Sequence, residues 1–312
     1  MRTAFIEHLC ALAAEDTRIF LVCGDLGYSV LEQFSERFPD RYLNAGVAEQ
    51  NMTGIAAGLA LAGRTVFTYS IANFPVMRCL EQIRNDVCYH NLSVKIVAVG
   101  GGLAYGSLGY THHGVEDLAV TSALPNLTVA APADPLEARQ ITSILAATPG
   151  PAYLRLGKAG EPVLHPSDLK VELGRAIQVS PGDALTIISI GGMLGTVLEA
   201  REELERTGIR PRVLSTPFLV PFDAAAVLAA AKETGAILTV EEHGPGGLGA
   251  AVAEVLAVNR CAVPFQMQRL AKAPIKISGS QEELRSAQGL SVQGIVQAAE
   301  GLVRAVRQKG KL

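Results

Sequence analysis

Short apolar runs alternate with longer stretches of mixed apolar and polar residues along the chain. Runs such as 19–23 and 94–99, the second of which is apolar apart from Lys95, are typical of strands that are buried on both faces of a parallel sheet. This alternation of strand and helix predicts an α/β fold with two domains, each a mostly parallel sheet flanked by helices. The expected strands are 19–23, 42–45, 65–70, 94–99, 127–131, 153–156, 185–190, 212–215 and 236–240, and the expected helices include 3–15, 30–38, 76–89, 116–124 and 135–147.

A polar segment interrupted by prolines separates two halves with the same strand–helix order. Its prolines are Pro162, Pro166 and Pro181. We therefore predict a first domain over 1–160, a linker over 161–182 and a second domain over 183–312. A chain of 312 residues is long enough for each domain to have its own core. The last residues, 309–312, predict a frayed basic tail.

The composition narrows the classes of function. The net charge of −3 gives no basic surface for nucleic acid or anionic membranes. No apolar run approaches the ~20 residues of a membrane span, and the acid-containing N-terminal helix does not resemble a signal peptide. The five cysteines are scattered without a CxxC pair. They indicate reduced thiols in a cytoplasmic protein and argue against a metal site built on them.

One stretch, residues 44–63, carries a single ionisable side chain, Glu49, among apolar, small and neutral polar residues. Helical spacing places Gly54, Gly58 and Ala62 on one smooth face. Because a glycine inside a helix costs roughly 1 kcal/mol relative to alanine, this face suggests that another backbone approaches closely.

Glu49 itself has two interpretations. Burial favours the neutral form of a carboxyl group unless a partner offsets the loss of water. The helix dipole or an arginine could stabilise the carboxylate, which is the commoner situation for a lone glutamate. Alternatively, the acid is retained for proton relay. Spacing alone favours stabilisation of the carboxylate by the dipole or an arginine.

Further candidates follow the ends of predicted strands, where open α/β sheets bind ligands. Asp25, after the first strand, could cap a helix or belong to a site. The long glycine-rich loop 100–114 ends in His112 and His113, and such loops are often functional, although adjacent loop histidines are more often surface residues. Its glycines lack the GxGxxG spacing of a dinucleotide site. Residues 241–243 could form a functional site or a capping arrangement, and capping is favoured.

Several segments, taken in order, resemble the C-terminal half of transketolases, and together they cover nearly the whole chain. They are Gly24-Asp25-Leu26, Asn44-Ala45-Gly46-Val47-Ala48-Glu49-Gln50-Asn51-Met52, Asn73-Phe74, Glu81-Gln82-Ile83-Arg84, Gly106…Gly109-Tyr110-Thr111-His112-His113, Pro132-Ala133-Asp134, Tyr153-Leu154-Arg155-Leu156-Gly157-Lys158 and Thr239-Val240-Glu241-Glu242-His243. The resemblance implies a thiamine diphosphate pyrimidine-binding domain followed by a transketolase C-terminal domain.

The resemblance also implies roles for individual residues. Glu49 matches the glutamate that hydrogen-bonds a ring nitrogen of the cofactor's aminopyrimidine and promotes its imino tautomer. Phe74 matches the aromatic residue that stacks on this ring, with Tyr69 as a reserve candidate. Asp25 matches an acid near the cofactor. In the family loop, His112 matches the histidine that contacts the donor's oxygens, and we include the adjacent His113 as a substrate residue. Lys158 lies where many relatives have an arginine for the substrate phosphate.

The family's other half is missing. The G-D-G…N-N motif that binds the diphosphate and Mg²⁺ or Ca²⁺ is absent from this sequence, and no metal ligands are expected here. The resemblance therefore implies an α subunit that carries those ligands, an α2β2 assembly, and a chain that is inactive alone. The loop also departs from the family, since Leu108 replaces an acid that would contact sugar hydroxyls. We expect a less hydroxylated or otherwise unusual sugar.

The leading interpretation is the β subunit of a two-chain transketolase, which transfers a two-carbon ketol unit from a ketose to an aldehyde. Two other interpretations share this half of the fold. The chain could be the β subunit of a 2-oxo acid dehydrogenase or a deoxyxylulose-phosphate-synthase-like protein that acts on pyruvate. It could also be a non-catalytic partner subunit, although the retained Glu49 argues against that.

Overall fold

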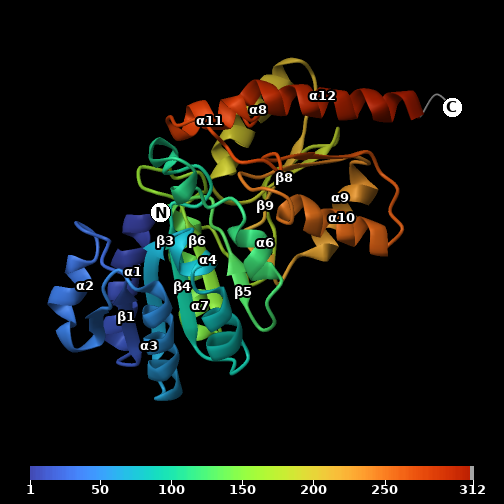
Figure 1. The fold of residues 1–312 in the computed structure, drawn as a ribbon. Coiled ribbons are helices and arrows are strands. Elements are labelled where there is room, and N and C mark those ends of the chain that lie inside the picture. The colour runs from blue at the N-terminus through green and yellow to red at the C-terminus, as the bar shows by residue number, and fades with distance from the viewer. Residues whose placement is uncertain (310–312) are drawn as a thin grey trace.

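The computed structural model describes residues 1–309, so most of the predicted basic tail at 309–312 lies outside the described residues. The chain forms two α/β units (Figure 1). The first sheet has seven strands in the order β10-β5-β6-β4-β3-β1-β2, and strands β1 to β6 are parallel. Their bounds are β1 Ile19–Cys23, β2 Tyr42–Asn44, β3 Thr65–Ile71, β4 Val94–Val99, β5 Thr128–Ala130, β6 Ala152–Leu156 and β10 Phe218–Val220.

Alternating side chains of the first sheet form two separate cores. On one face, Phe67 and Tyr69 of β3 pack with α1 and α7. On the other face, Val66 of the same strand packs with α3 and the helical segment η2. Successive residues of a strand point to opposite faces, so neighbours on β3 belong to different cores. The helices of this domain are α1 Arg2–Glu15, α2 Glu32–Arg37, α3 Glu49–Leu61, α4 Phe74–Met77, α5 Leu80–Gln82, α6 Asp117–Ser122 and α7 Pro135–Ala147, with η2 at Ile83–Cys88.

The second sheet has five strands in the order β12-β11-β8-β9-β7, of which only β7 is antiparallel. Helices α8 and α12 cover one face, and α9 and α10 lie on the other side of this domain (Figure 1). The bounds are β7 Ile177–Ser180, β8 Thr186–Ser189, β9 Arg212–Ser215, β11 Ile237–Val240, β12 Phe265–Gln268, α8 Leu194–Arg206, α9 Ala224–Glu233, α10 Leu248–Val258, α11 Gln281–Ala287 and α12 Val292–Lys309. The expected two-domain, mostly parallel architecture is confirmed.

Three elements differ from the expectations. Strand β7 falls inside the segment expected to be a linker and pairs with β9, so the second sheet begins before residue 183. Strand β10 leaves the second half of the chain and pairs antiparallel with β5 of the first sheet. The expected helix at 76–89 is divided into α4, α5 and the π-helical η2. The first sheet thus includes a strand from the second half of the chain, which joins the domains.

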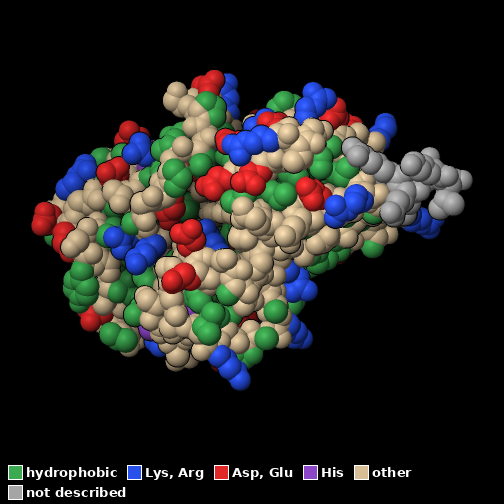
Figure 2. Space-filling model, turned by 90° about the horizontal axis from the view of Figure 1, so that it is seen from above, with side chains coloured by type: hydrophobic (Ala, Val, Ile, Leu, Met, Phe, Trp, Pro, Cys, Tyr) green, Lys and Arg blue, Asp and Glu red, His purple; other side chains and the backbone are tan. Residues whose placement is uncertain are grey.

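The surface and the thiols add further observations. The face in Figure 2 shows acidic and basic side chains interspersed, without a patch of one sign. All five cysteines are free thiols, and four of them are buried. Among the described residues, no helix is both long and apolar enough to cross a membrane.

Candidate functional site

The carboxyl edge of the first sheet gathers most of the predicted site residues. Asp25 follows β1, Phe74 follows β3, and the loop with His112 follows β4. Glu49 begins α3, which the chain enters from β2. Because these strands are parallel, their carboxyl ends share one edge of the sheet, where this fold class places its ligands.

Glu49 is buried and paired with an arginine. Its side chain is only 3% exposed, and Oε2 accepts a hydrogen bond from Nη1 of Arg78 at 2.9 Å. Arg78 is half exposed, so the pair lies at the boundary between protein and solvent. Of the two interpretations of Glu49, the structure shows the arginine partner, and the helix N-terminus adds a favourable dipole. The proton-relay interpretation stays open, because Arg78 binds only one carboxylate oxygen.

Arg78 also contacts the predicted aromatic residue. Its guanidinium carbon lies 4.2 Å from the centre of the Phe74 ring, and the His112 ring meets Phe74 edge-on with 5.2 Å between centres. Asn73 fixes the loop beside this ring, because its Nδ2 donates to the carbonyl oxygen of Thr111 at 3.0 Å. Glu49, Arg78, Phe74 and His112 therefore form one continuous row.

Two cavities open along this row. One, of about 450 Å³, is lined by Val47, Ala48, Glu49, Gln50, Asn51 and Arg78. The other, of about 330 Å³, is lined by Asn73, Phe74, Met77, Arg78, Tyr110 and Thr111. Arg78 is the residue common to both, so its side chain forms the wall between them.

Asp25 lies in the same region. It has a left-handed backbone with φ of 55°. Oδ1 of Asp25 accepts a hydrogen bond from Nδ2 of Asn44 at 2.9 Å. The backbone N–H of Asp25 donates to Oδ1 of Asn44. A Cβ at the preceding Gly24 would lie 3.6 Å from Cγ of Glu49. Asp25 therefore does not cap a helix but joins two strand ends next to the Glu49 helix.

Three predicted residues lie outside this row. The reserve candidate Tyr69 is wrong: its side chain is on the opposite face of the sheet, fully buried and stacked on Phe5. His113 is buried beside Tyr110, and burial lowers the pKa of its imidazole, which favours the neutral form. Lys158 is exposed, with Nζ 5.5 Å from the centre of the Tyr105 ring, and it lines neither cavity.

The smooth face of α3 is open. Gly54 and Gly58 are exposed, and a Cβ added at either would meet no atom within 4 Å. The close backbone approach expected from these glycines is therefore not made within this chain. Leu61, three residues after Gly58 and therefore on the same side of the helix, is exposed as well.

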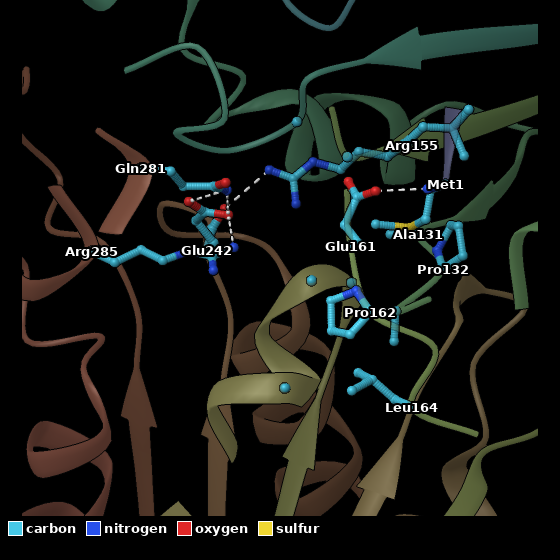
Figure 3. Close-up of a pocket in the computed structure, with 17 residues that line it drawn as sticks. Met1, Ala131, Pro132, Arg155, Glu161, Pro162, Leu164, Glu242, Gln281 and Arg285 are labelled. Atoms are coloured by element: carbon cyan, nitrogen blue, oxygen red, sulfur yellow. Dashed lines mark hydrogen bonds and ion pairs between the residues drawn. The ribbon is translucent and has the colours of Figure 1, made fainter. Parts of the chain in front are cut away.

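Sequence reasoning missed a buried polar cluster between the domains. Glu241 caps α10 as expected, because its carboxylate accepts hydrogen bonds from the backbone N–H groups of Leu248 and Gly249. The adjacent Glu242 instead reaches the first domain, and Figure 3 shows it between Gln281, Arg285 and Arg155. It lines a cavity of about 140 Å³ between the domains. The only signal in the sequence was a run of two acids at a strand end.

The residues of the row fit the ring portion of a thiamine-type cofactor. They provide a buried carboxylate and an aromatic ring beside open cavities. Among the residues that the structure describes, no cluster of three or more His, Cys, Asp or Glu could hold a metal ion. The described residues therefore fit the ring portion of such a cofactor.

Two α/β domains with an open polar site at the edge of the first sheet define the class of this chain. Residues 1–160 match the family described as "Transketolase, pyrimidine binding domain", and residues 174–295 match "Transketolase, C-terminal domain". The chain therefore belongs to the transketolase family, as the resemblance indicated.

Similar proteins include transketolase subunits. The chain is 38% identical over 306 residues to a subunit of the apulose-4-phosphate transketolase of Phocaeicola vulgatus, covering 97% of each protein. It is 35% identical over 301 residues to a 6-deoxy-6-sulfo-D-fructose transketolase subunit of a Clostridium species, covering 96% of this chain and 93% of that one. A solved structure described as "Split gene transketolase, inactive beta4 tetramer" superposes with a TM-score of 0.87 at 36% identity, covering 97% of each chain.

Proposed function

We propose that this chain is the β subunit of a two-chain transketolase, which moves a two-carbon ketol unit from a ketose donor to an aldehyde acceptor. The observation that carries the proposal is the row of Glu49, Phe74 and His112 at the open carboxyl edge of the first sheet. Membership of the transketolase family and the match to a split-gene transketolase over almost the whole chain support it.

In this proposal, thiamine diphosphate supplies the nucleophilic carbon and the electron sink that ketol transfer needs. Glu49 holds a proton against the ring nitrogen of the aminopyrimidine, and Phe74 orients that ring by stacking. Asp25, fixed by Asn44, helps to shape this end of the pocket. His112 donates a hydrogen bond to the donor's oxygen, where negative charge develops.

An α subunit completes the site. It provides the diphosphate and Mg²⁺ or Ca²⁺ ligands, which this sequence lacks. The open glycine face of α3 beside Glu49 is a surface on which such a partner could pack closely, and an α2β2 heterotetramer is the assembly we propose. A cytoplasmic location is part of the proposal, supported by the free thiols.

The proposed substrates include a sugar that differs from the common pentose phosphates. Leu108 is 54% exposed in a short turn of the histidine loop, at the position where the family resemblance implies an acid. An apolar side chain at this position disfavours a hydroxylated ligand. The relatives named for apulose 4-phosphate and 6-deoxy-6-sulfo-D-fructose support this direction. Lys158 and His113 remain proposed substrate residues. Such a role requires the histidine loop to move for His113, and the segment after β6 to move for Lys158, when a partner or substrate binds.

The test is reconstitution with a subunit that carries the diphosphate-binding half. Ketol transfer should occur only in the mixture, and Glu49→Gln should lower kcat by roughly 10²- to 10⁴-fold, the usual contribution of a proton-transfer group. Glu36→Gln, at an exposed position on α2, is the control. Decarboxylation of pyruvate without ketol transfer would contradict the proposal. Activity of this chain alone would do the same.

A further inference from the structure

The loop that carries His112 is buried at its base, where Leu103 and His113 lie, and exposed at its tip, around Leu108 and Thr111. It spans residues 100–114 and is closed at its base by an isolated bridge between Gly102 and Gly114, with hydrogen bonds of 2.7 and 2.9 Å. Gly100, Gly102 and Gly109 all have positive φ. Glycines widen the range of conformations open to the loop, so contacts with the rest of the protein add to the order that its own turns provide.

The second domain provides these contacts through Glu242. Its Oε1 accepts a hydrogen bond from the backbone N–H of Leu103, at the start of the loop, at 3.1 Å. Gln281 donates to both carboxylate oxygens at 3.0 Å, and Arg285 donates to Oε2 at 2.8 Å. Figure 3 shows Gln281 and Arg285 converging on Glu242 from the side of α11. The carboxylate is thus held by its own domain while it binds the backbone of the other.

The other end of the loop is held at the same point. Nη2 of Arg155 donates to the carbonyl oxygens of Gly114 at 2.7 Å and of Glu242 at 3.0 Å. The backbone N–H of Gly244 donates to the carbonyl oxygen of Val115 at 2.8 Å. Both ends of the loop therefore meet the turn that follows β11.

The loop backbone packs closely against Glu242 at Gly102, and elsewhere Glu242 lines the cavity of about 140 Å³ between the domains. A Cβ at Gly102 would lie 2.6 Å from the Glu242 carboxyl carbon, and one at Gly106 would lie 2.5 Å from the Leu284 side chain. Glu242 is 5% exposed. A buried, charge-assisted hydrogen bond loses much of its strength when either partner is replaced.

We infer that Glu242 is a positioning residue for the histidine loop, and that the second domain acts on the reaction by holding this loop against the first domain. The inference rests on the proposed function for the role of His112. It assigns the C-terminal domain a part in catalysis without contact between that domain and the substrate.

The test compares Glu242→Gln with Glu241→Gln. Both glutamates are buried and accept backbone hydrogen bonds, but Glu241 binds α10 instead of the loop. Amide hydrogen exchange of the isolated chain should become at least about tenfold faster over 102–114 in Glu242→Gln. In Glu241→Gln, exchange should instead become faster over α10, residues 248–258. Arg285→Met is a milder variant that should also loosen 102–114.

In the reconstituted enzyme, kcat/KM for the ketose should fall roughly tenfold to a hundredfold in Glu242→Gln. Part of this fall should come from a higher KM. Glu241→Gln should leave both constants unchanged. Unchanged exchange over 102–114 would overturn the inference. Faster exchange with unchanged kinetics would overturn it as well. If wild-type enzyme transfers no ketol unit, the proposed function fails, and hydrogen exchange still decides whether Glu242 orders the loop.

Discussion

Arg78 joins Glu49 to Phe74: its Nη1 lies 2.9 Å from Oε2 of Glu49, and its guanidinium carbon lies 4.2 Å from the centre of the Phe74 ring. A hydrogen bond to this glutamate and stacking on this aromatic ring are the two contacts that the family resemblance assigns to the cofactor's aminopyrimidine. A planar guanidinium can make both contacts. In this chain, Arg78 therefore occupies the position proposed for the pyrimidine ring.

The first prediction concerns Arg78→Met in the reconstituted enzyme. The cofactor no longer has to displace the half-exposed Arg78 from an ion pair worth about 1 kcal/mol, so thiamine diphosphate should bind roughly fivefold more tightly. Isothermal titration calorimetry measures the change. Arg84→Met, at an exposed arginine of the neighbouring helical segment, should bind like the wild type. Weaker binding by Arg78→Met would mean that Arg78 holds the cofactor instead of occupying its place.

The second prediction concerns the open face of α3. Gly58→Leu should leave the isolated chain folded and stabilise it by about 0.5–1 kcal/mol, because leucine favours a helix more than glycine and no described atom lies near its Cβ. The same side chain should block assembly with the α subunit. Light scattering after gel filtration separates the two effects. Gly301→Leu on α12, where a Cβ also meets nothing, should gain stability and still assemble.

The third prediction separates Tyr69 from Phe74. The Tyr69 hydroxyl is buried without a hydrogen-bond partner among the described residues, and burial raises the pKa of this phenol. Tyr69→Phe should therefore leave the thermal midpoint unchanged or raise it, with no effect on cofactor affinity. Phe74→Leu should weaken cofactor binding by about 1 kcal/mol, because it removes an aromatic stacking surface. Reduced affinity in Tyr69→Phe would restore Tyr69 as a site residue.

The sequence predicted the elements better than the contacts between them. Strands such as β4 and β6 are buried runs that are apolar apart from Lys95 and Arg155, so local pattern was sufficient to place them. Strand β10 was missed because it has three residues and pairs with β5, which lies far away in the sequence. Its pairing depends on where the whole second domain lies.

For the candidate site as well, single residues were easier to predict than the contacts between them. Glu49 and Phe74 were predicted from a helix start and a family motif. Arg78 was not, although its i+4 spacing from Phe74 on a helix places the two side chains together. Tyr69 was misplaced because strand alternation, which puts it on the face opposite α3, was not applied. Glu242 could not be distinguished from Glu241 by pattern, since only the tertiary fold determines which acid turns toward the loop.

The last prediction concerns a buried lysine far from the site. Nζ of Lys95 donates hydrogen bonds to the carbonyl oxygens of Thr148 and Gly150, which follow α7. Burial lowers the pKa of Lys95 to about 8, compared with 10.5 for an unperturbed lysine. Between these two values the unfolded chain keeps a proton that the folded chain has lost. Because the unfolded state binds more protons, the contribution of Lys95 to the unfolding free energy rises with pH in this window.

Lys95→Met should lack this rise. Relative to the variant, the wild type should gain up to about 3 kcal/mol of unfolding free energy between about pH 8 and pH 10.5. Urea unfolding of the isolated chain at several pH values measures the difference. Lys232→Met, at an exposed lysine of α9, should run parallel to the wild type. Parallel profiles for Lys95→Met and the wild type would show that the folded lysine keeps its proton throughout this range, held by the two carbonyl groups.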